Sequence, residues 1–220
     1  MGKNGSWRVL LIGGSLVLAL PPLMRGQEVG PYFNADIGVA LADRVEVRNV
    51  NSPGLFSGAT PGVKLDLDPG VRFGIAGGFN FNPFLGAEIE TGFIYNSIKS
   101  VIGPGGSVPV DGSLSHVPIM ANIVLRYDQP NSPFVPYGGG GAGGDLSIFS
   151  DNAADDSDTK FNFAWQAFAG VRYKLNETMS LGFAYKYYWV DDTSFDLNSG
   201  SLGLGHERIH SFLFEFNAKF

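Results

Sequence analysis

The chain ends in the sequence His210-Ser-Phe-Leu-Phe-Glu-Phe-Asn-Ala-Lys-Phe220, and its alternation of residue types decides the fold. The apolar residues at every second position are Phe212, Phe214, Phe216, Ala218 and Phe220. A repeat of two indicates a strand with one apolar and one mostly polar face. A barrel in the outer membrane imposes this pattern, because lipid lies outside and polar groups fill the lumen. We therefore predict the last strand of such a barrel; an edge strand of a soluble sandwich is the alternative.

The beginning of the chain carries a second signal for export. Lys3 and Arg8 precede the largely apolar run Val9–Leu20, after which two prolines break any helix. This order is typical of a secretory signal peptide. The run is shorter than the roughly 20 residues that a membrane-spanning helix needs. We predict a signal peptide over residues 1–26 and a barrel over residues 27–220; an uncleaved amphipathic anchor is the alternative.

Composition excludes several classes of protein. The chain has no cysteine, which excludes disulfide scaffolds, thiolate metal sites and cysteine nucleophiles. Its net charge of −6 argues against a nucleic-acid partner, which requires a basic face. The 31 glycines would weaken helices but are tolerated in barrel strands and turns.

Eight segments alternate with period two and have roughly the length of a tilted membrane strand, about 9–11 residues. They cover residues 32–42, 71–81, 85–98, 117–127, 137–149, 160–175, 179–190 and 210–220. The connections alternate between short (82–84, 128–134, 176–178) and long (43–65, 99–113, 150–159, 191–206). Short periplasmic turns and longer extracellular loops follow this order when both termini are periplasmic. The sequence therefore predicts an all-β fold: an eight-stranded antiparallel up-and-down transmembrane β-barrel.

The glycine-rich run Tyr137–Gly144 is the least typical of these segments. A flexible linker is one interpretation of such a composition. We prefer a strand whose small residues admit bulky neighbours, because apolar residues alternate again directly after it.

Charged residues fall on the face opposite the apolar one. The predicted interior set is Arg72, Glu88, Glu90, Arg126, Arg172, Lys174, Lys186 and Glu215. The apolar face instead places aromatics near its ends, as interfacial girdles require: Tyr95, Tyr127, Tyr173, Trp189 and Phe220. A soluble lipocalin-type barrel would have the opposite sorting. Because side chains fill the interior of an eight-stranded barrel, we expect a paired network rather than an open pore.

Three runs carry a family resemblance: Pro136–Gly143, Gln166–Tyr173 and Ser180–Tyr187. They resemble the outer-membrane-protein β-barrel domain family, whose relatives include small OmpA/OmpX-type barrels and surface-antigen porin-like proteins. The resemblance implies a bacterial outer-membrane location, contact with outer-membrane lipid and lipopolysaccharide, and insertion by the barrel-assembly machinery. It implies a monomer without cofactor. It also implies an assembly signal in the terminal aromatics Phe212, Phe214, Phe216 and Phe220.

Other candidate sites have weaker patterns. The aspartates around the third long connection could bind calcium through oxygen ligands, but their spacing fits a solvated acidic loop better: Asp145, Asp151, Asp155, Asp156 and Asp158. The histidines show no metal-ligand spacing with one another: His116, His206 and His210. In the connection 43–65, the apolar residues Val50, Leu55 and Phe56 could contact a partner or simply pack.

An enzymatic function is the hypothesis that the sequence supports least. Glu88 and Glu90 could form an acid/base couple inside the barrel. A barrel-type lipid A deacylase would need a lipid-facing His and Ser two positions apart, whereas Ser211 directly follows His210. No Gly-x-Ser-x-Gly elbow is present in the sequence. We therefore predict a non-enzymatic barrel with a role in envelope integrity or surface interaction; a narrow porin for small solutes and a lipid-modifying enzyme are the alternatives.

Overall fold

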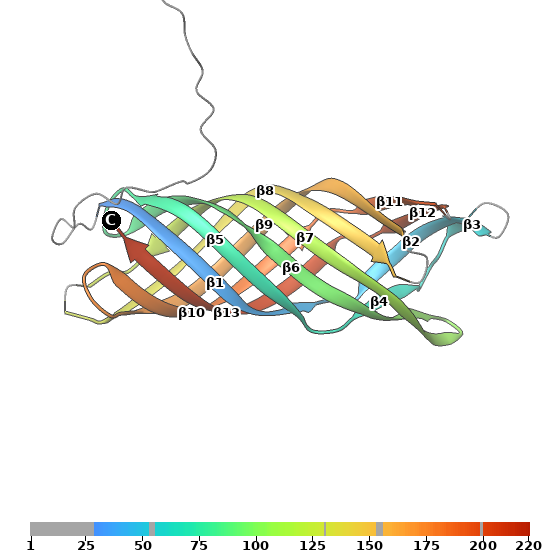
Figure 1. Ribbon diagram of the computed structural model, residues 1–220, viewed down its shortest axis with the longest axis horizontal. Helices are drawn as coiled ribbons and strands as arrows, with labels where there is room; N and C mark the ends of the chain where they lie inside the picture. The colour runs from blue at the N-terminus through green and yellow to red at the C-terminus, as the bar shows by residue number, and fades with distance from the viewer. Residues whose placement is uncertain (1–28, 53–55, 130, 153–155, 199) are drawn as a thin grey trace, which may run out of the picture.

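The computed structural model describes residues 29–52, 56–129, 131–152, 156–198 and 200–220 (Figure 1). The described residues form β-strands and no helix, so none of them belongs to a helix that could cross a membrane. The predicted signal peptide, residues 1–26, lies outside the described residues, as do Leu55 and Asp155.

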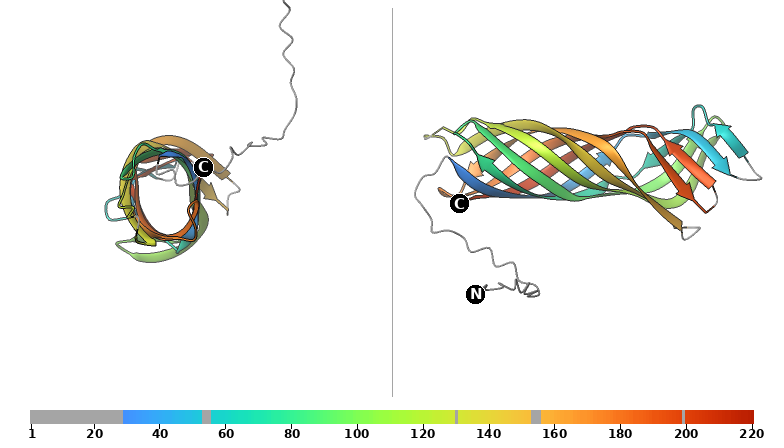
Figure 2. Two further views of the ribbon diagram at one scale, coloured as in Figure 1. Left: turned by 90° about the vertical axis from the view of Figure 1, so that its left-hand side faces the viewer. Right: turned by 90° about the horizontal axis from the view of Figure 1, so that it is seen from above.

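Eight strands form a closed antiparallel ring, whose ribbon appears as an oval when viewed along its axis (Figure 2). In ring order they are β1 (Gly30–Ala42), β5 (Gly70–Asn80), β6 (Leu85–Gly103), β7 (Gly106–Arg126), β8 (Phe134–Asp151), β9 (Asp156–Lys174), β10 (Met179–Val190) and β13 (Glu207–Lys219). The last strand pairs with the first, with Ile37 opposite Phe214, and this ladder closes the ring. The predicted eight-stranded antiparallel barrel is confirmed.

The two faces sort as the alternation predicts. Phe214 is 69 % exposed and Ile37 63 % exposed on the outer face, whereas the intervening Leu213 and Glu215 are buried. Asparagines shape two of the short connections: the Asn82 side chain accepts the N–H groups of the two residues that follow Pro83, at 2.8 Å each, and Asn176 accepts those of Thr178 and Met179. Asparagine favours turns because its side chain satisfies the backbone locally. The exposed apolar side chains on the outside of the ring therefore form the lipid-facing surface.

The glycine-rich segment is strand β8 and not a linker. A side chain at Gly139 would collide with the Phe168 ring, and one at Gly141 would collide with the Asn122 amide. On the other face, the Phe161 ring lies over Gly144. The bare strand is thus the surface against which its bulkier neighbours pack, as the sequence predicts.

The long connections differ from the prediction, because most of their described residues are strands rather than loops. They contain β2 (Val45–Ser52), β3 (Phe56–Ala59), β4 (Lys64–Leu67), β11 (Thr193–Leu197) and β12 (Gly200–Leu204), and the β6–β7 and β8–β9 hairpins extend beside them. Apolar residues of these connections and of the adjoining strand ends form a core of their own: Val45, Val47, Leu65, Ile98, Leu114, Phe149, Phe195 and Leu204. Burial of this second core explains why ordered strands form here. We call this core, together with the cavity that its residues line, the apolar chamber.

The wall of the apolar chamber has one irregular junction. Ladder pairing runs from β6 through β4, β2 and β12 to β11, but β11 has no ladder with β9 in the described chain. Instead, the Asp158 carboxylate accepts the backbone N–H of Asp196 at 2.6 Å, and the Asp156 carboxylate accepts that of Asn198 at 2.6 Å. Lys160 Nζ donates to Asp196 Oδ2 at 2.7 Å. Side chains therefore close this junction, which we call the seam.

Candidate functional site

A charged cluster fills the middle of the lumen. Glu90 lies at its centre and accepts hydrogen bonds from Arg72 Nη2 at 3.0 Å, Lys186 Nζ at 2.6 Å, Gln166 Nε2 at 2.7 Å and Asn122 Nδ2 at 2.9 Å. These residues come from five strands of the ring, and each is at most 4 % exposed. Two cations and two amides satisfy the buried carboxylate, as burial of a charge requires. We call this cluster the polar plug.

A second polar layer lies toward the periplasmic end. Glu88 accepts the Tyr32 hydroxyl at 2.8 Å. Glu215 accepts the Tyr137 hydroxyl and faces Arg172 Nε at 3.4 Å, while the Arg172 guanidinium lies 4.0 Å from the centre of the Tyr137 ring. Glu88, Arg172 and Glu215 are thus brought together inside the barrel with neutral hydroxyl partners that sequence analysis did not identify.

The remaining two predicted interior residues lie at the periplasmic rim. Arg126 donates to the carbonyls of Asn82 and Pro83 in the β5–β6 turn. Lys174 is an interior residue by prediction, but its side chain is 28 % exposed and pairs with Asp128, which also binds Lys219 at 3.1 Å. Its strand has reached the end of the barrel there, so the inward face meets water.

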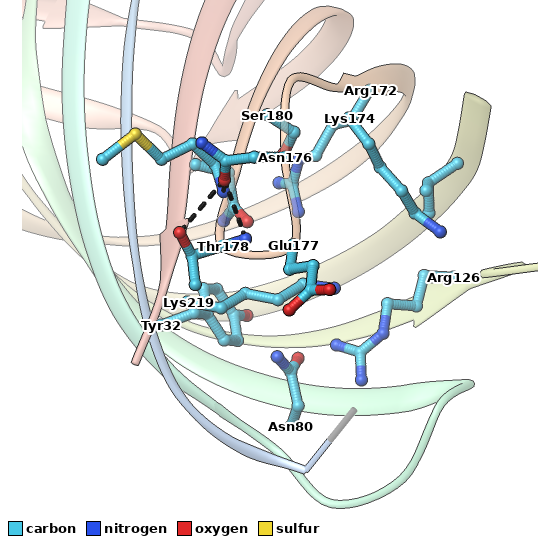
Figure 3. A pocket seen from close by; sticks show the side chains of 13 residues that line it. Tyr32, Asn80, Arg126, Arg172, Lys174, Asn176, Glu177, Thr178, Ser180 and Lys219 are labelled. Atoms are coloured by element: carbon cyan, nitrogen blue, oxygen red, sulfur yellow. Dashed lines mark hydrogen bonds between the residues drawn. The ribbon is translucent and has the colours of Figure 1, made fainter. Parts of the chain in front are cut away.

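Arg126, Lys174 and Lys219 line a small pocket of about 30 Å³, which has room for about one water (Figure 3). Burial opposes ionisation of Asp128, but the two lysines outweigh it, and the pKa of its carboxyl lies below the usual range. The rim cations are therefore held by backbone carbonyls and by a carboxylate rather than left to attract a ligand.

A third cluster, which sequence analysis missed, lies toward the extracellular end. His116 Nδ1 is 2.8 Å from Asp145 Oδ2, and His116 Nε2 is 3.0 Å from Glu207 Oε2. The Tyr188 hydroxyl donates to Asp145 Oδ1 at 2.8 Å. Assigning Asp145 to the acidic loop was wrong: it is fully buried on β8. Tyr137 is an inward residue of the same strand, and the two-residue alternation from Tyr137 would have placed Asp145 inside the barrel.

The other acidic residues serve the seam and the hairpin ends. Asp156 and Asp158 accept backbone N–H groups, as described above, and the tip of the β7–β8–β9 region is held by Asn152 donating to Asp111 at 2.9 Å. Over the described ranges, no group of three or more His, Cys, Asp or Glu side chains is arranged to hold a metal ion.

A buried cluster of mostly apolar side chains lies at the level of His116 and Glu207, as the pairing of Ile94 with His116 and of Val190 with Glu207 shows. This cluster consists of Ala40, Ile94, Met120, Ala164, Tyr188, Val190 and Ile209. Above it lies a cavity of about 400 Å³ whose walls are mostly valine, leucine, isoleucine and phenylalanine. Its lining includes Val50, predicted as a contact residue of the first long connection, and its polar edge is formed by Asp111 and Asp151.

A closed antiparallel ring with an apolar outside and charged residues packed inside defines a transmembrane β-barrel of the outer-membrane type. The family model of the outer membrane protein beta-barrel domain matches residues 9–207, and the chain belongs to this family. Its location is accordingly the bacterial outer membrane.

Individual relatives support the same assignment. The chain is 29 % identical over 132 residues to the 22 kDa outer membrane protein of Rhizobium leguminosarum bv. viciae, covering 59 % of this chain and 61 % of that protein. The outer membrane protein OprG of Pseudomonas aeruginosa is similar in structure, with a TM-score of 0.62 and 18 % identity, covering 87 % of this chain and 98 % of OprG. Neisserial surface protein A has a TM-score of 0.50 and 17 % identity, covering 87 % and 97 %. At these identities, the structural likeness establishes the fold.

Proposed function

We propose that this protein is a non-enzymatic outer-membrane barrel that keeps its lumen closed and acts through its extracellular strands in surface interaction. The observation that carries the proposal is the filled lumen. Arg72, Glu90, Ile94, Met120 and Tyr188 are each at most 1 % exposed. A narrow porin would need a continuous aqueous path past these side chains, so the pore alternative loses support.

Enzymatic alternatives also lose support from the geometry. Glu90 is 1 % exposed and saturated by four donors, and Glu88 is bonded to Tyr32 and Asn122. An acid/base couple must reach its substrate, and these carboxylates are enclosed. His210 faces outward whereas Ser211 is fully buried inside, so they do not form a nucleophile and base pair.

Conductance across planar lipid bilayers tests the closed lumen. We expect no stable steady current from the purified wild-type protein. Lys186→Ala removes one cation of the polar plug, whereas Lys99→Ala removes an exposed cation outside the lumen. We expect any current to appear with Lys186→Ala and not with Lys99→Ala. Reproducible channels from the wild-type protein would replace this proposal with the pore alternative.

A second candidate function is supported by the apolar chamber. We infer that its cavity of about 400 Å³ accepts a compact apolar molecule, because cavities with apolar walls and few polar groups are typical binding sites. Quenching of an apolar fluorophore in bilayer-embedded protein would measure this. Val50→Trp should fill the cavity and abolish binding, whereas Leu181→Trp on the lipid face should leave it unchanged. Equal binding by both variants would assign the signal to the bilayer.

The remaining expectations concern the surroundings of the barrel. Delivery by the barrel-assembly machinery through the terminal aromatics, contact with lipopolysaccharide and a monomeric state stay predictions. They are consistent with the outward exposure of Phe212, Phe214 and Phe216 on β13, which lies between β1 and β10, and with the exposure of Phe220 directly after it.

A further inference from the structure

The outward face of β13 changes character at His210. Toward the periplasm, the outward residues are phenylalanines, with Phe212 44 % and Phe214 69 % exposed. Toward the extracellular end, the outward residues are His210 and Arg208, while the alternate residues Glu207 and Ile209 stay buried inside. This change marks the level at which the lipid-facing surface passes from hydrocarbon to headgroups.

Arg208 is an exposed cation without an ion pair in the described part of the chain. Its Nη2 atom lies 3.0 Å from His206 Nε2. Two acidic side chains of this region have other partners: Asp43 Oδ1 faces His210 Nε2 at 3.7 Å, and Asp192 pairs with Arg48 and faces His206 Nδ1 at 3.9 Å. The guanidinium therefore presents a positive charge outward at the membrane boundary.

A ledge of aromatic rings adjoins this cation. In the β10–β13 ladder, Trp189 is directly opposite Arg208. The Trp189 ring is stacked between His206, at 5.9 Å and 24°, and Trp165, at 6.2 Å and 28°. Tyr187 lies edge-on to His210 at 5.2 Å. These contacts fix flat, amphipathic rings beside the charge, and such rings favour the interface between lipid and water.

We propose that Arg208, oriented by His206 and flanked by Trp189, forms a site for the headgroup of a phosphorylated glycolipid in the outer leaflet. Arg208 binds the phosphate, because the planar guanidinium with its several N–H donors matches phosphate oxygens geometrically. His206 Nε2 accepts a hydrogen bond from Arg208 and so orients the guanidinium. The edge of the half-buried Trp189 ring lies beside the sugar, because its faces stack on His206 and Trp165. The acyl chains then lie along the phenylalanines below. The site is on the outer wall, so it is independent of the apolar chamber and of the closed lumen.

The occupant is a glycolipid and not a glycerophospholipid because the charge and the ring ledge lie side by side. A phosphate alone would require only the cation. A phosphate attached to a sugar matches both parts of the site at once, while its acyl chains satisfy the apolar face.

The test uses the full-length barrel in nanodiscs of phosphatidylethanolamine alone, with added bisphosphorylated lipid A, or with enzymatically dephosphorylated lipid A. Native mass spectrometry counts retained lipid. We expect the wild-type protein to retain bisphosphorylated lipid A preferentially, and Arg208→Ala to bind it about tenfold more weakly, which equals about 1.4 kcal/mol. Trp189→Leu should lower the preference for lipid A over phosphatidylethanolamine. Lys99→Ala, which removes an exposed cation on β6, is the matched control and should bind like the wild type.

Three results would overturn the proposal. Unchanged retention by Arg208→Ala would remove the phosphate contact. Equal retention of dephosphorylated lipid A would show that phosphate is not recognised, and equal retention of phosphatidylethanolamine would indicate general lipid contact. Heat-modifiable migration in detergent gels checks that each variant is folded, so loss of binding is separated from loss of the barrel.

Discussion

Lys186 and Glu90 are 96 positions apart in the sequence, and Nζ of the lysine lies 2.6 Å from Oε1 of the glutamate in the middle of the lumen. The two strands that carry them, β10 and β6, are not neighbours in the ring, so the contact crosses the barrel interior. It ties opposite walls together in a place where an unpaired charge would be costly.

The first prediction concerns this pair. Lys186→Met leaves Glu90 with one cation fewer, and removing one partner of a buried ion pair costs about 3–5 kcal/mol. The midpoint of urea unfolding in lipid bilayers should fall accordingly. Lys99→Met, an exposed site, should change the unfolding free energy by less than about 0.5 kcal/mol. Equal midpoints for both variants would contradict a stabilising role of the polar plug.

The second prediction concerns the lipid face. Phe214 is 69 % exposed among other apolar residues, so Phe214→Arg should destabilise the inserted barrel by roughly 2–4 kcal/mol if the site lies at the bilayer midplane. Deleting Phe220 should lower the amount of protein in the outer membrane by removing the terminal aromatic. Urea unfolding in lipid bilayers measures the free-energy change of Phe214→Arg, and immunoblots of membrane fractions measure the amount of each variant. Thr159→Arg, on an exposed extracellular position, is the control, and normal levels of the first two variants would refute the assignment.

The third prediction concerns strand β8. A side chain at Gly141 would collide with Asn122 Oδ1 and with the backbone carbonyl of Ala121, and backbone cannot move aside cheaply. Gly141→Val should therefore cost at least about 1–3 kcal/mol, the usual cost of overpacking, and reduce refolding yield. Gly77→Val is the matched control, because nothing lies within 4 Å of a Cβ placed there. Similar yields for both would argue against close packing over β8.

The fourth prediction is the pH dependence of the seam. The backbone N–H of Asp196, followed by Lys160, lowers the pKa of Asp158 below its usual value near 3.9. A lowered folded-state pKa means that the carboxylate stabilises the seam above about pH 4 and loses this effect as the pH falls through the folded pKa. Amide hydrogen exchange at Asp196 measures it against Asp158→Ala at each pH. The protection difference should be full at pH 7 and vanish in acid; a constant difference would contradict the role of the carboxylate.

Much of the fold follows from the two-residue alternation of apolar and polar side chains. The alternation in residues 210–220 and in seven other segments predicts the ring, since an outward phenylalanine and an inward glutamate can be sorted only in a barrel of this kind. The same alternation places Arg72 and Glu90 inside. It does not reveal which side chains meet, because contacts across the lumen depend on how far each strand is staggered around the ring.

The long connections are where the sequence is least informative. Their strands are short and interrupted by turns, with Gly62 and Gly106 at positive φ of 79° and 126°. Apolar residues such as Val45 and Leu65 are separated along the chain, so their common core appears only after β2 and β4 are placed side by side. Asp145 was misplaced for a related reason, because acidic neighbours in sequence suggested a loop although the residue continues the inward row of β8.

The seam gives the two halves of the wall unequal mechanical strength. In the membrane, an uninterrupted ladder from Tyr32–Lys219 to Ala42–Ile209 joins the first and last strands. A force that pulls these two strands apart is therefore distributed over every pair of the ladder. At the seam, a pull between β9 and β11 acts on a few aspartate and lysine contacts that can break one after another. A barrel stretched across its extracellular rim should thus open first between β9 and β11. The opening should stop at Phe163, where the β9–β10 ladder begins. The carbonyl of Phe163 accepts the N–H of Asp191 there at 3.0 Å.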